Sequence, residues 1–285
     1  MLIKWPKITG AIASFLMIST MITSMEIPAV KAQESSSLKQ TIAQRPRIKK
    51  VKKNGKFKVI YHEVSNPEYQ ELREALAENK LFDILANVFN EILVLPQNVT
   101  VNVTECGEAN AFYSPKQKAI FICYELMEDF ANDFKDSAES EEELMKNVLY
   151  TTTFVFYHEA GHALIDILDL PVTGKEEDAA DQLATFILTL GGDDGEEIAL
   201  SAIKQFQIAS ERDDNKNLWD EHSLDEQRFY NLLCLLYGSN PEKYSDVVTD
   251  EILPESRAEG CSAEYEKVSK SWLKLLKPHM KKQYQ

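Results

Sequence analysis

Apolar positions divide the chain into a strand-rich first half and a helical second half. Alternation with period two indicates strands, whereas longer apolar stretches with helical spacing indicate helices. In chain order, the pattern predicts a strand over 57–63, a helix over about 66–94, a strand over 99–104, a hairpin of 110–113 and 119–124, and helices around 151–168, 183–188 and 229–237. This order indicates an α+β fold with a mixed N-terminal sheet and a helical C-terminal lobe.

The N-terminal segment differs from the rest of the chain. Lys4 and Lys7 precede an uncharged apolar stretch over 8–25, and small residues around Ala32 resemble a signal-peptidase site. We therefore expect a signal peptide over 1–32, cleaved after Ala32, and a secreted or periplasmic protein with no stable membrane span. An uncleaved membrane anchor is the alternative, because about eighteen apolar residues just span a bilayer.

After this segment, the composition predicts two further parts of the chain. Residues 33–55 are polar and read as a flexible linker, whereas the globular pattern covers 56–285. That length fits one large domain with an N-terminal lobe over about 56–165 and a C-terminal helical lobe over about 166–285.

The most informative chemistry lies within the helix predicted around 151–168. His158, Glu159 and His162 form an HExxH pattern, in which residues i and i+4 share one helix face, so both imidazoles can bind one metal ion. Glu159 lies one step round the helix, where it can take a proton from a water that the metal activates. The apolar or small residues on both sides indicate a buried helix, which is typical of a catalytic zinc site.

A catalytic zinc needs a third protein ligand and an open position. The acidic run over 176–182 begins the next apolar helix, after a turn that contains Pro and Gly. We predict Glu177 as this ligand, because Asp181 then lies four residues on and can accept the other ring N–H of a ligand histidine. Asp178 is the alternative ligand. The run could also simply stabilise a helix N-terminus, where carboxylates are favoured.

The chain resembles the gluzincins, thermolysin-like zinc metallopeptidases in which HExxH is followed by ExxxD on the next helix. The matching residues are His158, Glu159, His162, Glu177 and Asp181, although the interval between the two motifs is shorter than in thermolysin-like enzymes. Over about 57–279, and above all over 158–184, the chain is similar to a bacterial family of secreted predicted metallopeptidases, long labelled a domain of unknown function. The resemblance implies a gluzincin-like fold and one zinc ion per chain.

The predicted hairpin contains a second motif. Asn110, Ala111, Phe112 and Tyr113 resemble the segment that forms the edge strand beside the metal in gluzincins. An unpaired edge strand offers N–H and C=O groups to an extended peptide. The resemblance therefore implies that these residues bind a peptide or protein substrate; an aromatic hairpin packed into the core is the alternative.

One histidine of the C-terminal lobe is a further candidate for catalysis. Amide hydrolysis builds negative charge on the carbonyl oxygen, and a hydrogen-bond donor opposite the metal stabilises that charge. Gluzincins commonly take a His or Tyr from the C-terminal lobe, which implies His222 here. A surface histidine at the start of a helix is the alternative, and Arg228, Tyr230 and Arg257 are lesser candidates for the same role.

The four cysteines are consistent with an oxidising compartment. Cys106 and Cys123 flank the predicted hairpin, so we expect them to pair, and Cys234 and Cys261 form the remaining disulfide. A cysteine metal site is disfavoured because no C-x-x-C spacing occurs.

Charge narrows the range of partners. The formal net charge is −15, which argues against nucleic-acid binding because phosphate neutralisation requires a basic face. We expect the acidic patches over 136–143 and 193–197 to be solvated loops. A calcium site at 193–197 is a weaker alternative, since the spacing does not follow an EF-hand loop. Nothing in the sequence indicates an oligomeric state.

The sequence thus predicts zinc-dependent hydrolysis of peptide bonds with Glu159 as the general base. One alternative is a catalytically silent metal-binding or scaffold protein with the same fold, although such a protein would not need Glu159. Another is a metal-dependent amidohydrolase that acts on non-peptide amides, for which the edge-strand motif would have no peptide to bind.

Overall fold

The structure is a computed structural model that describes residues 55–212 and 218–285. The predicted signal peptide, its cleavage site and the linker up to residue 54 lie outside the described residues. The elements are β1 (Phe57–Tyr61), α2 (Pro67–Glu78), α3 (Leu81–Ile92), β2 (Val99–Thr104), β3 (Ala111–Ser114), β4 (Ala119–Cys123), α4 (Tyr124–Phe134), α5 (Glu141–Leu168), α6 (Glu176–Leu190), α7 (Gly192–Arg212), α8 (Asp225–Ser239), α9 (Asp246–Thr249), α10 (Glu255–Leu276), η1 (Lys277–His279) and η2 (Lys282–Tyr284).

The strands form one mixed sheet in the order β1-β2-β4-β3. β1, β2 and β4 are parallel, whereas β3 pairs antiparallel with β4, which confirms the predicted hairpin and the α+β class. The apolar residues of one sheet face are fully buried against the helices; they are Val99, Val101, Val103, Ile120 and Ile122. β3 is an edge strand of this sheet, so one side of its backbone has no strand partner among the described residues.

The predicted helix over 66–94 is wrong in one respect, because the structure contains two helices there. Lys80 adopts a left-handed conformation, with φ of 54°, and separates α2 from α3. The side-chain amide of Asn79 donates to the carbonyl oxygen of Ala75 at 2.7 Å and so satisfies the end of α2. Asn is a common residue at such helix ends. β1 also ends at Tyr61, two residues before the predicted end.

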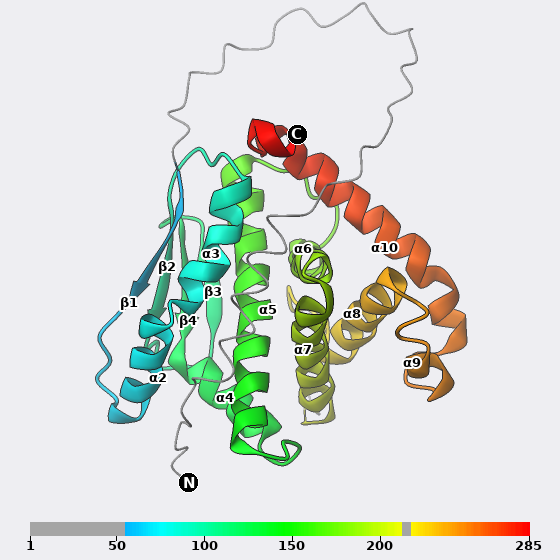
Figure 1. The fold of residues 1–285 in the computed structure, drawn as a ribbon, viewed down its shortest axis with the longest axis horizontal. Helices are drawn as coiled ribbons and strands as arrows, with labels where there is room; N and C mark the ends of the chain where they lie inside the picture. The colour runs from blue at the N-terminus through cyan, green and yellow to red at the C-terminus, as the bar shows by residue number, and fades with distance from the viewer. Residues whose placement is uncertain (1–54, 213–217) are drawn as a thin grey trace, which may run out of the picture.

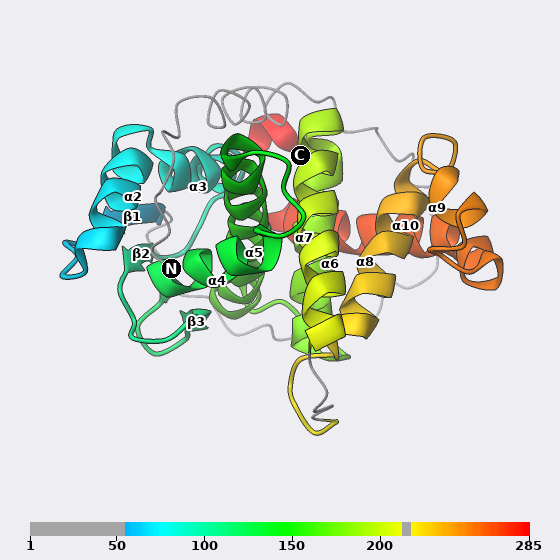
Figure 2. The same cartoon turned by 90° about the horizontal axis from the view of Figure 1, so that it is seen from below.

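α5 stands between the sheet and the helical lobe (Figure 1). It packs against β3 and β4 on one side and against α6 and α7 on the other. α8 lies against α6, α7 and α10, which is seen best from below (Figure 2). After α10 the chain returns to the segment that follows α3, where the N–H of Val94 donates to the carbonyl oxygen of His279 at 2.8 Å.

The acidic patch at 193–197 is not the solvated loop that we predicted, because it forms the first turns of α7. Glu196 is buried and accepts a hydrogen bond from the Tyr244 hydroxyl at 2.6 Å. Lys243 forms ion pairs with both Glu196 and Asp193. These carboxylates therefore join the start of α7 to the segment after α8. Residues 141–143 of the other acidic patch likewise lie in a helix, the first turn of α5.

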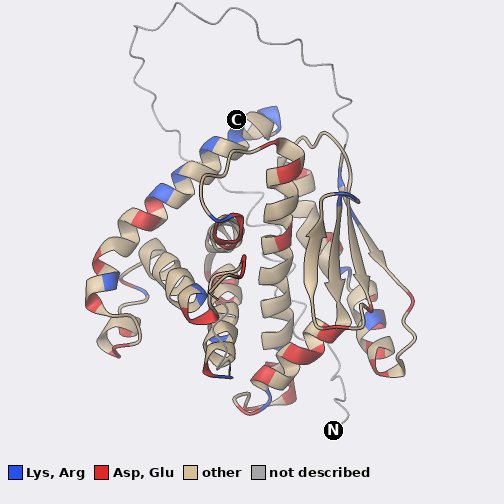
Figure 3. Cartoon of the chain, turned by 180° about the vertical axis from the view of Figure 1, so that it is seen from behind, with Lys and Arg blue, Asp and Glu red and all other residues tan. Residues whose placement is uncertain are grey.

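Charged residues are distributed unevenly over the fold. Acidic residues lie on most elements, whereas Lys and Arg gather toward the C-terminal end of α10 and the end of the chain (Figure 3). No helix within 55–212 or 218–285 has the length and apolar character needed to cross a membrane.

Candidate metal centre

The HExxH residues lie in the buried middle of α5. His158 and Glu159 are both buried, so their polar atoms need partners within the protein. The preceding threonines, Thr152 and Thr153, donate their hydroxyls to carbonyl oxygens four residues earlier, at 2.7 and 2.8 Å. The hydroxyls of these two threonines are therefore paired although they are buried, whereas the buried hydroxyl of Tyr157 on the same helix has no hydrogen-bond partner.

Gly161 brings α6 close to this part of α5. A Cβ atom at Gly161 would lie 3.1 Å from Cα of Ala180 and 3.2 Å from its Cβ, which is closer than most real side-chain contacts. The two small residues therefore allow the helices to approach closely at this point. As a result, the acidic first turn of α6 faces the histidines of α5.

Three potential ligand atoms meet between α5 and α6. Nε2 of His158 lies 3.1 Å from Oε2 of Glu177, and Nε2 of His162 lies 3.3 Å from the same oxygen. The two Nε2 atoms are 3.2 Å apart. The three atoms thus form a nearly equilateral triangle.

This triangle fits a tetrahedral metal ion. Ligand atoms bound at 2.0–2.1 Å to four-coordinate zinc are about 3.3 Å apart, which is close to all three observed separations. Two imidazoles and one carboxylate are also the donor set of many catalytic zinc sites. Other divalent ions accept these donors as well, so the geometry supports a metal more strongly than it selects zinc.

The electrostatics of the cluster favour positive charge at its centre. Burial opposes ionisation of Glu177, but hydrogen bonds from the histidine rings outweigh it and hold its pKa well below the usual range. Burial likewise opposes a charged ring at His162, but the Glu177 and Glu176 carboxylates outweigh it and raise the pKa of His162 to about 9. A cation placed between these groups would therefore be stabilised.

Each histidine of the motif has a second carboxylate on its other ring nitrogen. Nδ1 of His158 lies 2.7 Å from Oδ1 of Asp181, and Nδ1 of His162 lies 2.8 Å from Oε1 of Glu176. Such partners fix the tautomer and orientation of ligand imidazoles and point the Nε2 atoms toward the metal. Asp181 thus lies against His158, one helical turn after Glu177 on α6.

Arg228 of α8 holds the Asp181 carboxylate in place. Its guanidinium donates to both carboxylate oxygens of Asp181, at 2.7 and 2.8 Å, and lies 4.1 Å over the ring of Phe206. Burial alone would raise the pKa of Asp181, but Arg228 and His158 outweigh it and lower that pKa. Asp181 is therefore an anion that can accept the ring N–H of His158.

Glu159 lies between the histidines and the edge strand. Burial raises the pKa of its carboxyl group, while both histidines and a hydrogen bond from the backbone of Tyr113 act in the opposite direction. A buried carboxylate with a raised pKa is suited to proton transfer near neutral pH. The backbone contact also places β3 directly beside the HExxH helix.

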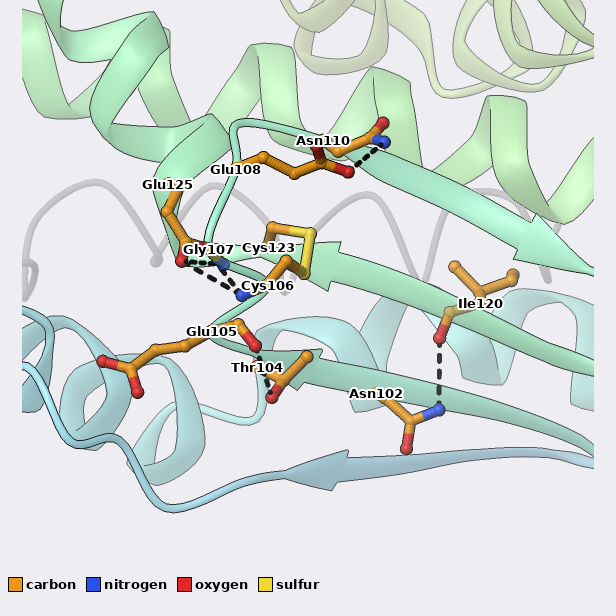
Figure 4. Close-up of a disulfide and its surroundings, with 10 residues drawn as sticks. All are labelled: Asn102, Thr104, Glu105, Cys106, Gly107, Glu108, Asn110, Ile120, Cys123 and Glu125. Atoms are coloured by element: carbon orange, nitrogen blue, oxygen red, sulfur yellow. Dashed lines mark hydrogen bonds between the residues drawn. A yellow bond between two sulfur atoms is a disulfide. The ribbon is translucent and has the colours of Figure 1, made fainter.

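The four residues of the hairpin motif face different surroundings. Phe112 is partly exposed and stacks on Phe121 of β4, with ring centroids 4.8 Å apart. The carbonyl oxygen of Asn110 accepts from the N–H of Cys123 at 3.2 Å, and its side-chain amide donates to Glu108 (Figure 4). Ala111 is half-buried in the same strand. Phe112 is therefore not part of the closed core.

The side chain of Tyr113 ties the edge strand to α5. Its hydroxyl donates to Oδ2 of Asp166 at 2.5 Å, and Nζ of Lys118 donates to the same oxygen at 2.5 Å. Asp166 lies one helical turn after His162 on α5. This three-residue contact fixes the distance between the strand and the metal-binding helix.

His222 lies at the same cluster, although it comes from the segment before α8. Its Nε2 atom is 3.1 Å from Oε2 of Glu177, the oxygen that the other two histidines also approach. Its Nδ1 atom is 3.1 Å from Oδ1 of Asp220. The ligand atoms of His158, Glu177 and His222 all lie within 4.8 Å of one another.

The remaining candidates have other partners. Oδ1 of Asp178, the alternative third ligand, accepts a hydrogen bond from the Ser223 hydroxyl at 2.7 Å. Asp178 also lines an open pocket of about 410 Å³, together with Ser223 and residues of α8 that include Tyr230. Arg257 forms an ion pair with Glu264, a residue of the same helix α10. The structure thus brings Glu177, rather than Asp178, against the histidines.

Both expected disulfides are present. Cys106 and Cys123 are joined, with Cα atoms 5.5 Å apart, and Cys234 is joined to Cys261, with Cα atoms 5.1 Å apart. Around the first disulfide, the Glu125 carboxylate accepts backbone N–H groups from Cys106 and Gly107 (Figure 4). Its two sulfurs are bonded to each other, so this group of side chains has no thiolate to offer a metal.

Sequence reasoning missed two residues that orient the site. Glu176 directly precedes the predicted ligand, and its signal is that each ligand histidine needs a carboxylate for its other ring nitrogen. No local pattern connects Arg228 to Asp181, 47 positions earlier, so the sequence suggests Arg228 only as a donor to substrate.

Two imidazoles and a carboxylate meeting at one point, with a buried glutamate beside them, define a candidate metal-dependent hydrolase site. The chain belongs to the family described as "Putative metallopeptidase", whose sequence profile matches residues 61–276. No curated protein and no solved structure matches the chain significantly. The family description supports a hydrolase that uses a metal and acts on peptides, and the two disulfides are compatible with a secreted protein.

Proposed function

We propose that the protein is a secreted or periplasmic zinc metallopeptidase of the gluzincin type, with one zinc ion held by His158, His162 and Glu177. The observation that carries this proposal is the triangle of ligand atoms, with sides of 3.1, 3.2 and 3.3 Å. When bound, a zinc ion at this position would activate water and polarise the scissile carbonyl group.

The protein side chains supply the remaining chemistry. Glu159 takes a proton from the attacking water and delivers it to the leaving amine, a role that its burial and raised pKa support. Asp181 and Glu176 keep the two α5 imidazoles oriented. His222, which lies against Glu177, would donate a hydrogen bond to the carbonyl oxygen of the substrate and stabilise the negative charge that develops there.

The edge strand β3 would hold the substrate. Its unpaired side offers main-chain N–H and C=O groups to an extended peptide or protein segment. Asn110, Ala111, Phe112 and Tyr113 would form this binding strand beside Glu159. We expect replacement of Asn110 or Phe112 to raise KM or lower kcat for peptides, whereas a non-peptide amide substrate would be unaffected.

The first experiment measures zinc content and cleavage of an unfolded protein substrate. We expect one zinc per chain in the wild type, loss of both zinc and cleavage in Glu177→Ala, and no loss of zinc in the matched control Asp178→Ala. Glu159→Gln should keep zinc but lose cleavage by roughly 10²–10⁴-fold.

Three outcomes would contradict this proposal. Zinc retained by Glu177→Ala would place the third ligand elsewhere. A zinc-loaded wild type that cleaves no peptide bond would favour a scaffold protein, or an amidohydrolase if it cleaves small amides instead. A wild type that binds no divalent metal would remove the basis of the proposed site.

A further inference from the structure

The three histidines of the cluster share one pattern of contacts. The Nδ1 atoms of His158, His162 and His222 each face a carboxylate, at 2.7, 2.8 and 3.1 Å. Their Nε2 atoms each approach Oε2 of Glu177, at 3.1, 3.3 and 3.1 Å. A carboxylate on one ring nitrogen is the usual arrangement of a histidine that binds a metal through the other nitrogen.

The segment that carries His222 is fixed to the start of α6. Nζ of Lys175 donates to the carbonyl oxygen of His222 at 3.2 Å, and the Ser223 hydroxyl donates to Asp178 at 2.7 Å. The backbone N–H of His222 donates to Oδ1 of Asp220 at 2.9 Å. These contacts hold the imidazole beside Glu177 without any contribution from a substrate.

We propose that His222 is a fourth protein ligand, which occupies the open coordination position of the zinc while no substrate is bound. This inference rests on the proposed zinc site. The substrate-free enzyme would then be latent, because His222 would take the coordination position that water or substrate needs.

His222 is also the ligand that can leave. Its side chain is 47% exposed, whereas those of His158, His162 and Glu177 are 6, 12 and 15% exposed. It is the only one of the four that lies outside the packed helices α5 and α6. A peptide that enters along β3 can therefore displace the imidazole from the zinc without disturbing the other ligands.

The test counts histidine ligands in the zinc-loaded full-length protein. X-ray absorption spectra of the wild type should fit three imidazoles, and those of His222→Ala should fit two. We expect His222→Ala to weaken zinc binding at least tenfold in competition with a chelator. Glu221→Gln is the matched control, because it changes a neighbouring charge without removing a ligand atom, and it should leave the affinity unchanged.

A second measurement tests displacement of His222. Adding acetohydroxamate, a small metal-binding probe, to the wild type should reduce the fitted imidazoles from three to two. A wild type that binds zinc through two imidazoles, with the same affinity in His222→Ala, would overturn the inference while leaving the proposed peptidase intact. Three imidazoles in the presence of bound hydroxamate would overturn displacement of His222, and absence of zinc from the wild type would overturn both proposals.

Discussion

Arg228 of α8 donates two hydrogen bonds to Asp181. Through this contact, α8 keeps the Asp181 carboxylate ionised beside the HExxH helix. Both side chains are largely buried, at 15 and 8% exposure. A buried carboxylate that loses its cation is left partly uncompensated, which is far more costly than loss of a surface ion pair. The contact therefore links the packing of α8 to the orientation of His158.

Replacing Arg228 should affect both folding and metal binding. We expect Arg228→Met to lower the free energy of unfolding by about 3 kcal/mol and to weaken zinc binding by about tenfold or more. The matched control is Arg257→Met, which removes a more exposed pair with Glu264 and should cost less than about 1 kcal/mol without affecting zinc. Denaturant unfolding and chelator competition give the two values, and unchanged zinc affinity in Arg228→Met would contradict the positioning role.

The two carboxylates that orient the α5 histidines should differ in importance. Asp181 is buried, whereas the side chain of Glu176 is 50% exposed, so water can replace much of its effect on His162. We expect Asp181→Asn to weaken zinc binding by about 100-fold and Glu176→Gln by about tenfold or less. Chelator competition on both variants in one buffer measures the two zinc affinities. A larger loss of zinc affinity in Glu176→Gln than in Asp181→Asn would show that burial of the carboxylate does not determine its importance.

Much of the site could be predicted from sequence because its determinants are local. His158 and His162 share one face of the helix because they are four residues apart. The short turn between the two helices then brings the start of the next helix, with Glu177, back beside them. The hairpin and the disulfide that closes it were predictable for the same reason, because Cys106 and Cys123 lie at its two ends. Each of these inferences depends on a short stretch of chain.

Three features could not be predicted, because they depend on tertiary contacts or on weak local signals. Arg228 reaches Asp181 only because α8 packs on α6, which no periodicity reveals. The break at Lys80 was missed because the apolar pattern continues through it, although Asn79 before it is a common helix-ending residue. The acidic run at 193–197 looked solvated because its partner Lys243 lies some 50 residues later.

The anchor of the edge strand should depend on pH. Burial opposes ionisation of Asp166, but Lys118 and Tyr113 outweigh it and lower its pKa. A carboxyl group with a lowered folded-state pKa adds stability above its unfolded pKa of about 3.9, and that stability is lost as pH falls through the folded value. We expect Asp166→Asn to lose about 1–2 kcal/mol at pH 7.

This loss should shrink toward zero at acid pH, where the wild-type carboxyl group is protonated as well. Denaturant unfolding of wild type and Asp166→Asn across pH 2–7 gives the comparison. A difference between the two proteins that stays constant with pH would mean that the charge of Asp166 does not stabilise the strand anchor.

Two glycines in helices should respond oppositely to alanine. A Cβ atom at Gly195 of α7 would lie 2.0 Å from the carbonyl oxygen of Leu188, whereas nothing lies within 4 Å of one at Gly260 of α10. We expect Gly195→Ala to destabilise the protein by roughly 2–3 kcal/mol through overpacking. Gly260→Ala should stabilise it by roughly 0.5–1 kcal/mol through helix propensity. Thermal and denaturant unfolding measure both, and equal effects would contradict the close approach of α6 and α7.

The disulfide between Cys234 and Cys261 should stabilise the helical lobe without being needed for the metal. It joins α8 to α10 across a sequence separation of 27, for which loop-closure entropy gives about 3–4 kcal/mol. We therefore expect the double variant Cys234→Ala with Cys261→Ala to lose about that much stability. Zinc should remain bound at temperatures below the melting temperature of this variant, because α8 also packs on α6 and α7 and keeps Arg228 at Asp181. Loss of zinc from the folded double variant would show instead that the disulfide itself positions α8 at the metal centre.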